Sequence, residues 1–138
     1  MQKPGERGIY IIVNMMRKFP LTLLVGFVAF VGYLSISKML GFGDFTNWLE
    51  VTVGGDKVLH FGIASMLCLL SLMAFDDRFS WWKIMGVLMG LLTCEELTQL
   101  VLPNRHFGFD DLLAGLGGLL WVGFLYKGTQ ILVEKVIK

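Results

Sequence analysis

The chain has few charged residues. Asp, Glu, Lys and Arg make up 17% of its 138 residues, whereas a soluble domain carries about 25%. Hydrophobic residues account for 55%, and the mean hydropathy is +0.68. So small a polar fraction cannot cover the surface of a soluble protein of this length, and the composition therefore indicates an integral membrane protein.

Cysteines, excess positive charge and metal-binding motifs are also scarce or missing. Cys68 and Cys94 lie inside apolar runs and are interpreted as packing residues rather than as a disulfide. The net charge is +1 with both signs scattered, so nucleic-acid binding has no support. The sequence has no HExxH, no CxxC and no two histidines one helical turn apart. We therefore predict neither a metal site nor a cofactor.

Four apolar segments are long enough to cross a bilayer, which takes about 20 residues of helix. We place these spans at residues 21–40, 58–75, 82–102 and 111–126. Pro20 stands where a helix start tolerates proline, and Pro103 stops the third span. Residues 9–16, IYIIVNMM, form either an interfacial helix or an early turn of the first span. The predicted fold is all-α: a compact bundle of four transmembrane helices in one domain.

Basic residues are unevenly divided between the two sides of this bundle. Nine lie in the N-terminal arm, the middle loop and the tail, namely Lys3, Arg7, Arg17, Lys18, Arg78, Lys83, Lys127, Lys135 and Lys138. Three lie in the two other loops, namely Lys38, Lys57 and Arg105. Because cytoplasmic loops carry such an excess, both termini are predicted to be cytoplasmic. Residues 42–55 are expected to lie along the outer interface, and Trp81 and Trp82 at the inner one.

Ionisable residues concentrate at the predicted outer end of three spans. The segment EELTQLVLPNRHFGFDD, residues 95–111, joins the third span to the fourth, and DKVLH, residues 56–60, opens the second. Glu96 and Gln99 share a helix face, and Glu95 is placed to pair with Gln99 four residues on. A carboxylate in a membrane helix is costly and by default marks function or a specific partner.

Small residues are expected to let the helices approach closely. One stripe on the second span comprises Lys57, His60, Ala64, Cys68 and Ser71, and one on the fourth comprises Asp111, Ala114, Gly115 and Gly118. On the third span, Gly86 and Gly90 form a small-xxx-small pair. A tight bundle with a polar group buried at its outer end is the simplest assembly.

The ordered set of DKxxH, ExxQ, Arg and a helix-start Asp resembles the VanZ-like family of small bacterial membrane proteins. The matching positions are Asp56, Lys57, His60, Glu96, Gln99, Pro103, Arg105 and Asp111, within about residues 56–120. Glu95 stands where the family usually has Asp, and Gly115 where it often has Asn. The founding member is associated with low-level teicoplanin resistance. The resemblance therefore implies a multi-pass protein of the bacterial cytoplasmic (inner) membrane that affects glycopeptide susceptibility.

Two kinds of function fit these residues. In the first, an outer-leaflet pocket binds the headgroup of a membrane lipid or lipid-linked cell-wall precursor. Lys57 and Arg105 would hold an anionic group, while Glu96, Gln99 and His60 hydrogen-bond the headgroup. In the second, a membrane-embedded hydrolase or transferase acts on a lipid-linked envelope substrate, with Glu96 and His60 as acid and base.

Structural roles are open for the same residues. Glu96 and Arg105 would also serve as a buried ion pair that fixes the register of the bundle. Asp111 would orient Arg105 or cap the fourth helix. His106 and Asp110 are expected to be solvated. Acids outnumber bases here, with Asp56, Glu95, Glu96, Asp110 and Asp111 against Lys57 and Arg105, and this excess opposes a purely anion-binding pocket.

Overall fold

The fold is entirely helical over the part of the chain that the structure, a computed structural model, describes: residues 4–102 and 107–137. It consists of α1 (Pro4–Met39), α2 (Asp44–Val53), α3 (Asp56–Phe75), α4 (Trp81–Thr98) and α5 (Phe109–Ile137). No strand occurs within those two ranges. The all-α prediction is confirmed.

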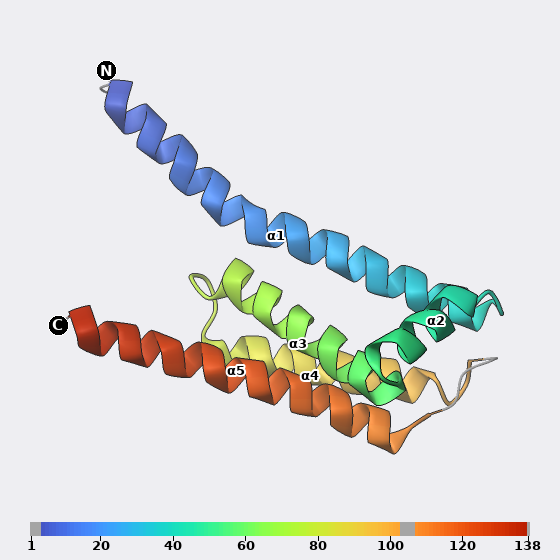
Figure 1. Cartoon of the computed structure of the whole chain (residues 1–138). Coiled ribbons are helices and arrows are strands. Elements are labelled where there is room, and N and C mark those ends of the chain that lie inside the picture. The colour runs from blue at the N-terminus through green and yellow to red at the C-terminus, as the bar shows by residue number, and fades with distance from the viewer. Residues whose placement is uncertain (1–3, 103–106, 138) are drawn as a thin grey trace.

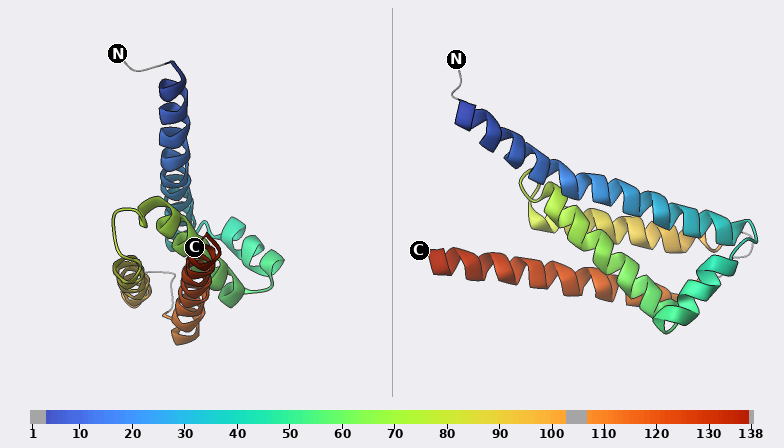
Figure 2. Two further views of the ribbon diagram at one scale, coloured as in Figure 1. Left: turned by 90° about the vertical axis from the view of Figure 1, so that its left-hand side faces the viewer. Right: turned by 45° about the horizontal axis from the view of Figure 1, so that its top comes forward.

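The central helix is α3, which packs against each of the other four helices. Its most extensive contact is with α5, and α5 also packs on α4. Within the described ranges, the backbone of the first helix, α1, comes close to those of α3 and α2 but not to that of α4. Figure 1 shows the N-terminal part of α1 extending past the bundle, with both termini at the end opposite α2. Figure 2 shows α1 and α4 standing apart on two sides of α3.

The core lies where α3, α4 and α5 meet. Ala64, Cys68 and Leu72 of α3 pack with Ile84, Met85 and Leu88 of α4 and with Leu119 of α5. The predicted small-residue stripe of the second span is therefore buried from Ala64 onward. On α5, a Cβ added at Gly118 would lie 2.3 Å from the carbonyl oxygen of Phe61. Only glycine permits this approach of α5 to α3.

The predicted role of Gly86 and Gly90 is wrong. Both are exposed, and a Cβ added at either would meet nothing within 4 Å. The close approach between α4 and α5 occurs instead at Gly123, where an added Cβ would lie 2.6 Å from Met85 Cε. The indole Nε1 of Trp81 donates a hydrogen bond to the carbonyl oxygen of Gly123 at 3.0 Å. This bond anchors the start of α4 against α5.

Three helices are long and apolar enough to cross a membrane: Lys18–Met39, Asp56–Phe75 and Phe109–Val136. Many large apolar side chains on them are exposed, including Val25, Phe30 and Trp121, as expected of surfaces that face lipid. The membrane class is therefore supported. The fourth helix, α4, is not among the three because its 18 residues include Lys83, Glu95 and Glu96.

Several predicted boundaries need correction. The first helix begins at Pro4, so Pro20 lies inside it and residues 9–16 are continuous with the span. Figure 1 shows α1 changing direction along its length, as an internal proline causes. The third segment ends as a helix at Thr98 rather than at 102, and the fourth continues from 126 to Ile137. Residues 44–53, expected only to lie along the interface, form the helix α2.

Candidate functional site

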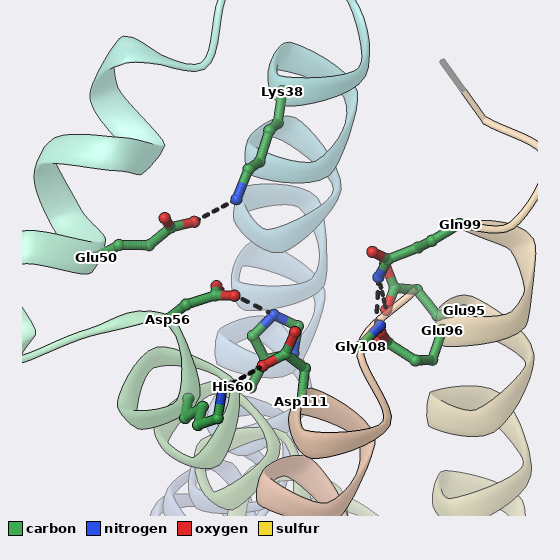
Figure 3. A network of polar contacts seen from close by, with 10 residues as sticks. Lys38, Glu50, Asp56, His60, Glu95, Glu96, Gln99, Gly108 and Asp111 are labelled. Carbon is green, nitrogen blue, oxygen red and sulfur yellow. Dashed lines mark hydrogen bonds and ion pairs between the residues drawn. The ribbon is translucent and has the colours of Figure 1, made fainter. Parts of the chain in front are cut away.

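The polar residues of three helices meet at the end of the bundle that α2 covers. The start of α3 contributes Asp56 and His60, the end of α4 contributes Glu95 and Glu96, and the start of α5 contributes Asp111 (Figure 3). The turn from α2 into α3 depends on two glycines at positive φ, Gly54 at 103° and Gly55 at 124°. Side chains other than glycine adopt this backbone conformation with strain. The predicted convergence of the three segments is observed for these residues.

One group comprises Asp56, His60 and Asp111, whose side chains point toward one another in Figure 3. His60 Nε2 lies 3.4 Å from Asp56 Oδ1, one turn away on the same helix. One possible ligand atom from each of the three residues lies within 4.8 Å of the other two. The sequence prediction of no metal site used spacing along the chain, and it missed this group because Asp111 comes from another helix.

Two oxygens of this group lack hydrogen bonds. Asp56 Oδ1 and Asp111 Oδ1 are shielded from solvent and have no hydrogen-bond partner within the described residues. The contact of Asp56 Oδ1 with His60 Nε2, at 3.4 Å, is within the distance of an ion pair. Lys57 Nζ lies 3.8 Å from Asp111 Oδ1 and 3.6 Å from Asp110 Oδ2, but its side chain is 62% exposed. Such a solvated contact stabilises little.

Asp111 is not the cap of its helix. It lies in the first turn of α5, which begins at Phe109, and its backbone N–H donates to the carbonyl oxygen of Gly108 at 3.0 Å. A Cβ added at Gly108 would lie 2.1 Å from Asp111 Oδ2. The chain before α5 therefore fits closely around this carboxylate, and only glycine leaves it room.

A second group surrounds Glu96, whose side chain is 2% exposed. The side-chain amide of Gln99 donates to Glu96 Oε2 at 3.1 Å and to Glu95 Oε1 at 3.2 Å. The backbone N–H of Gly108 donates to Glu96 Oε1 at 3.1 Å. The pairings predicted from helical spacing are therefore present, and Glu96 joins the end of α4 to the segment before α5.

Arg105 lies outside the described residues, together with Pro103, Asn104 and His106. The predicted pair of Arg105 with Glu96 therefore stays a prediction. In the described structure, both Glu96 oxygens accept hydrogen bonds from Gln99 and Gly108.

A cavity of about 210 Å³ opens beside the first group, between α1, α3 and α4. Its polar lining consists of Ser35, Lys38, Thr46, Glu50, Asp56, His60 and Glu95. Its apolar lining consists of Val31, Leu34, Leu59, Ile63, Ala64, Leu67, Leu91 and Leu92. Asp56 and His60 thus line it, whereas Lys57, Glu96 and Asp111 do not.

Sequence reasoning missed Lys38 and Glu50, which form an ion pair at 2.5 Å and both line the cavity. Lys38 closes the first span and Glu50 lies on α2, so the pair connects these two helices. No sequence pattern marked this pair. Thr46 of α2 is buried and Glu50 partly so, but Asp44 and Asn47 are exposed and Leu49 is partly buried.

A larger apolar groove of about 580 Å³ adjoins the cavity. Its walls come from α1, α3 and α4, including Leu24, Val28, Phe75 and Val87, and it shares Leu67 and Leu91 with the cavity. A polar chamber that leads into an apolar groove can hold a molecule with a polar head and an apolar tail.

The chain matches no protein-family model, no curated protein and no solved structure. What the site does has to follow from its own residues. The likeness to VanZ-like proteins stays a prediction from the sequence.

Proposed function

We propose that this chain is a multi-pass protein of the bacterial cytoplasmic membrane that binds the polar headgroup of a membrane lipid or lipid-linked cell-wall precursor. The observation that carries the proposal is the mixed lining of the cavity. The lining combines the charged and hydrogen-bonding groups of Lys38, Glu50 and His60 with apolar side chains, most of them leucines. This polarity matches an amphiphile rather than a wholly soluble or wholly apolar ligand.

The adjoining groove supports a ligand that carries an acyl or prenyl chain. It begins at Leu67 and Leu91, where the cavity ends, and continues past Phe75 and Val87. A headgroup seated beside His60 would direct its chain into this groove. The acyl or prenyl chain of the ligand would then remain in an apolar environment, as it does in the bilayer.

A fourth crossing by α4 is part of the proposal. At 1.5 Å per residue, its 18 residues span about 27 Å, close to the roughly 30 Å of a bilayer core. Its charged residues lie in the first and last turns, and residues 84–94 between them carry none. It also packs beside α3 and α5. An uncharged middle at this position favours a spanning helix over a peripheral one.

Both termini would be cytoplasmic, as the distribution of basic residues indicates. A reporter fused after Gly43 should then be detected outside, and one fused after Lys138 inside. Alkaline phosphatase, which is active only outside, and a fluorescent protein that matures inside give the two readings. Opposite locations of the two reporters are expected of four spans. The same location for both would mean that α4 does not cross.

An acid–base role for Glu96 and His60 is not favoured by the geometry. Glu96 does not line the cavity, and both of its oxygens accept hydrogen bonds. We also propose, from the sequence resemblance alone, that the protein affects susceptibility to teicoplanin. Growth at graded teicoplanin concentrations, with and without the gene, tests this point separately.

Native mass spectrometry of the gently extracted protein tests headgroup binding. Wild type is compared with Ile63→Trp, which fills the cavity, and with Met66→Trp on the exposed face of the same helix. A co-purifying lipid should be present in wild type and in Met66→Trp but lost in Ile63→Trp. An equal amount in all three, or none in wild type, would contradict the proposal.

A further inference from the structure

We infer that Asp56, His60 and Asp111 form a binding site for a divalent metal cation such as Zn²⁺ or Mn²⁺. The inference goes beyond headgroup binding and does not depend on it. Asp56 and His60 lie one turn apart on α3, and Asp111 approaches them from the start of α5. Two helices thus present two carboxylates and one imidazole to a common point (Figure 3).

The distances fit a small cation. Ligand atoms about 2.0–2.2 Å from a tetrahedral Zn²⁺ lie roughly 3.4 Å from one another. His60 Nε2 and Asp56 Oδ1 already have this separation, at 3.4 Å. All three possible ligand atoms lie within 4.8 Å of one another, so small side-chain adjustments would bring the set to the separations of a tetrahedral site.

The hydrogen-bond pattern is an independent indication of a ligand. Carboxylate oxygens that are withdrawn from water normally accept hydrogen bonds, because leaving them unpaired is costly. Asp56 Oδ1 and Asp111 Oδ1 are both withdrawn from solvent, and neither accepts a hydrogen bond among the described residues. Their contacts are the longer ones with His60 Nε2 at 3.4 Å and with the exposed Lys57 Nζ at 3.8 Å. Although the Asp56 side chain as a whole is 40% exposed, its Oδ1 is not. A cation between the two oxygens would satisfy both.

The close fit around Asp111 supports a fixed ligand. A Cβ at Gly108 would lie 2.1 Å from Asp111 Oδ2, so the neighbouring chain limits where the carboxylate can go. Metal sites need ligands that are oriented in advance by their surroundings. Lys57, at 3.8 Å from Asp111 Oδ1, is an exposed ammonium that a divalent cation would displace from the carboxylate.

The donor set indicates the class of cation. Imidazole nitrogen favours Zn²⁺ and other transition metals over Ca²⁺ and Mg²⁺, which prefer oxygen ligands alone. Three protein ligands leave at least one coordination position open. Since Asp56 and His60 also line the cavity, this position is accessible from it. A bound cation would also offset the excess of acids at this end of the bundle.

Manganese binding to the full chain in dodecyl maltoside tests the inference. The protein is stripped with EDTA and titrated with Mn²⁺, and free Mn²⁺ is followed by electron paramagnetic resonance. Wild type should bind one Mn²⁺ per chain, and Zn²⁺ should displace it. Asp111→Asn and His60→Ala should each weaken binding by about ten-fold or more. Asp110→Asn is the matched control, because this neighbouring carboxylate is 71% exposed and outside the group.

The titration overturns the inference if wild type fails to bind Mn²⁺, or if Asp111→Asn and Asp110→Asn bind equally. A thermal melt keeps the test decisive if a variant does not fold, since Zn²⁺ should raise the melting temperature of wild type itself. No rise in wild type would overturn the site. Lipid co-purification is measured in a separate experiment, so either proposal can fail without the other.

Discussion

The two ends of α3 each carry a carboxylate that faces α5, and the two carboxylates differ in their hydrogen bonds. At the C-terminal end, Asp76 Oδ2 accepts a hydrogen bond from the hydroxyl of Tyr126 at 3.3 Å and another from the side-chain amide of Gln130. At the N-terminal end, Asp56 Oδ1 and Asp111 Oδ1 have no such partner in the described structure. The first arrangement is complete within the protein and braces two helices. The second is incomplete and therefore suits a ligand.

Disturbing the close approach of α5 to α3 should have the largest effect on stability. Gly118→Ala places a Cβ against the backbone oxygen of Phe61, whereas the nearest atoms to a Cβ at Gly117 lie 3.9 Å away. We expect Gly118→Ala to cost about 1–3 kcal/mol of stability and Gly117→Ala much less. Reversible unfolding in mixed micelles measures both. Equal losses would mean that the close contact of Gly118 with Phe61 does not determine how tightly α3 and α5 pack.

The brace at Asp76 predicts a loss of stability that is equal to that of Gly118→Ala or smaller. Asp76→Ala leaves the Tyr126 hydroxyl and the Gln130 amide without their acceptor, and we expect about 1–3 kcal/mol of destabilisation. Tyr126→Phe removes one of the two bonds and should cost about 0.5–1.5 kcal/mol. The same unfolding assay measures both variants. A Tyr126→Phe loss as large as that of Asp76→Ala would assign the brace to the tyrosine alone.

The site at the N-terminal end of α3 predicts the smallest change in stability, and one of opposite sign. In the presence of EDTA, Asp111→Asn removes the charge from a carboxylate whose Oδ1 has no hydrogen bond. Stability should be unchanged or higher by up to about 1 kcal/mol. The comparison between the two ends fails if this variant is destabilised as strongly as Asp76→Ala. That result would make Asp111 a second brace.

Local patterns in the sequence were sufficient to predict much of the fold and part of the site. The pairing of Glu96 with Gln99 follows from a spacing of three residues on a helix, and it is observed at 3.1 Å. The apolar blocks likewise placed α3 close to its observed bounds. These features depend only on residues that are near one another in the chain.

Contacts between helices could not be predicted from such local patterns. The approach of Asp111 to His60 depends on the angle between α3 and α5, which the packing of Gly118 against Phe61 sets. The pair of Lys38 with Glu50 depends on α2 folding back over the cavity. The predicted contact at Gly86 and Gly90 failed for the same reason: small residues permit a close approach, but they do not say which neighbour will use it.

The separation of α1 from α4 bears on how a ligand would reach the site. The backbones of these two helices do not approach closely within the described ranges, and the apolar groove lies between them. If the groove opens along the side of the bundle, it faces the bilayer. A lipid could therefore enter by sliding sideways within its own leaflet, with its tail never leaving hydrocarbon. Entry would then depend on two-dimensional diffusion and on the lipid composition around the protein, and an aqueous concentration would not describe it.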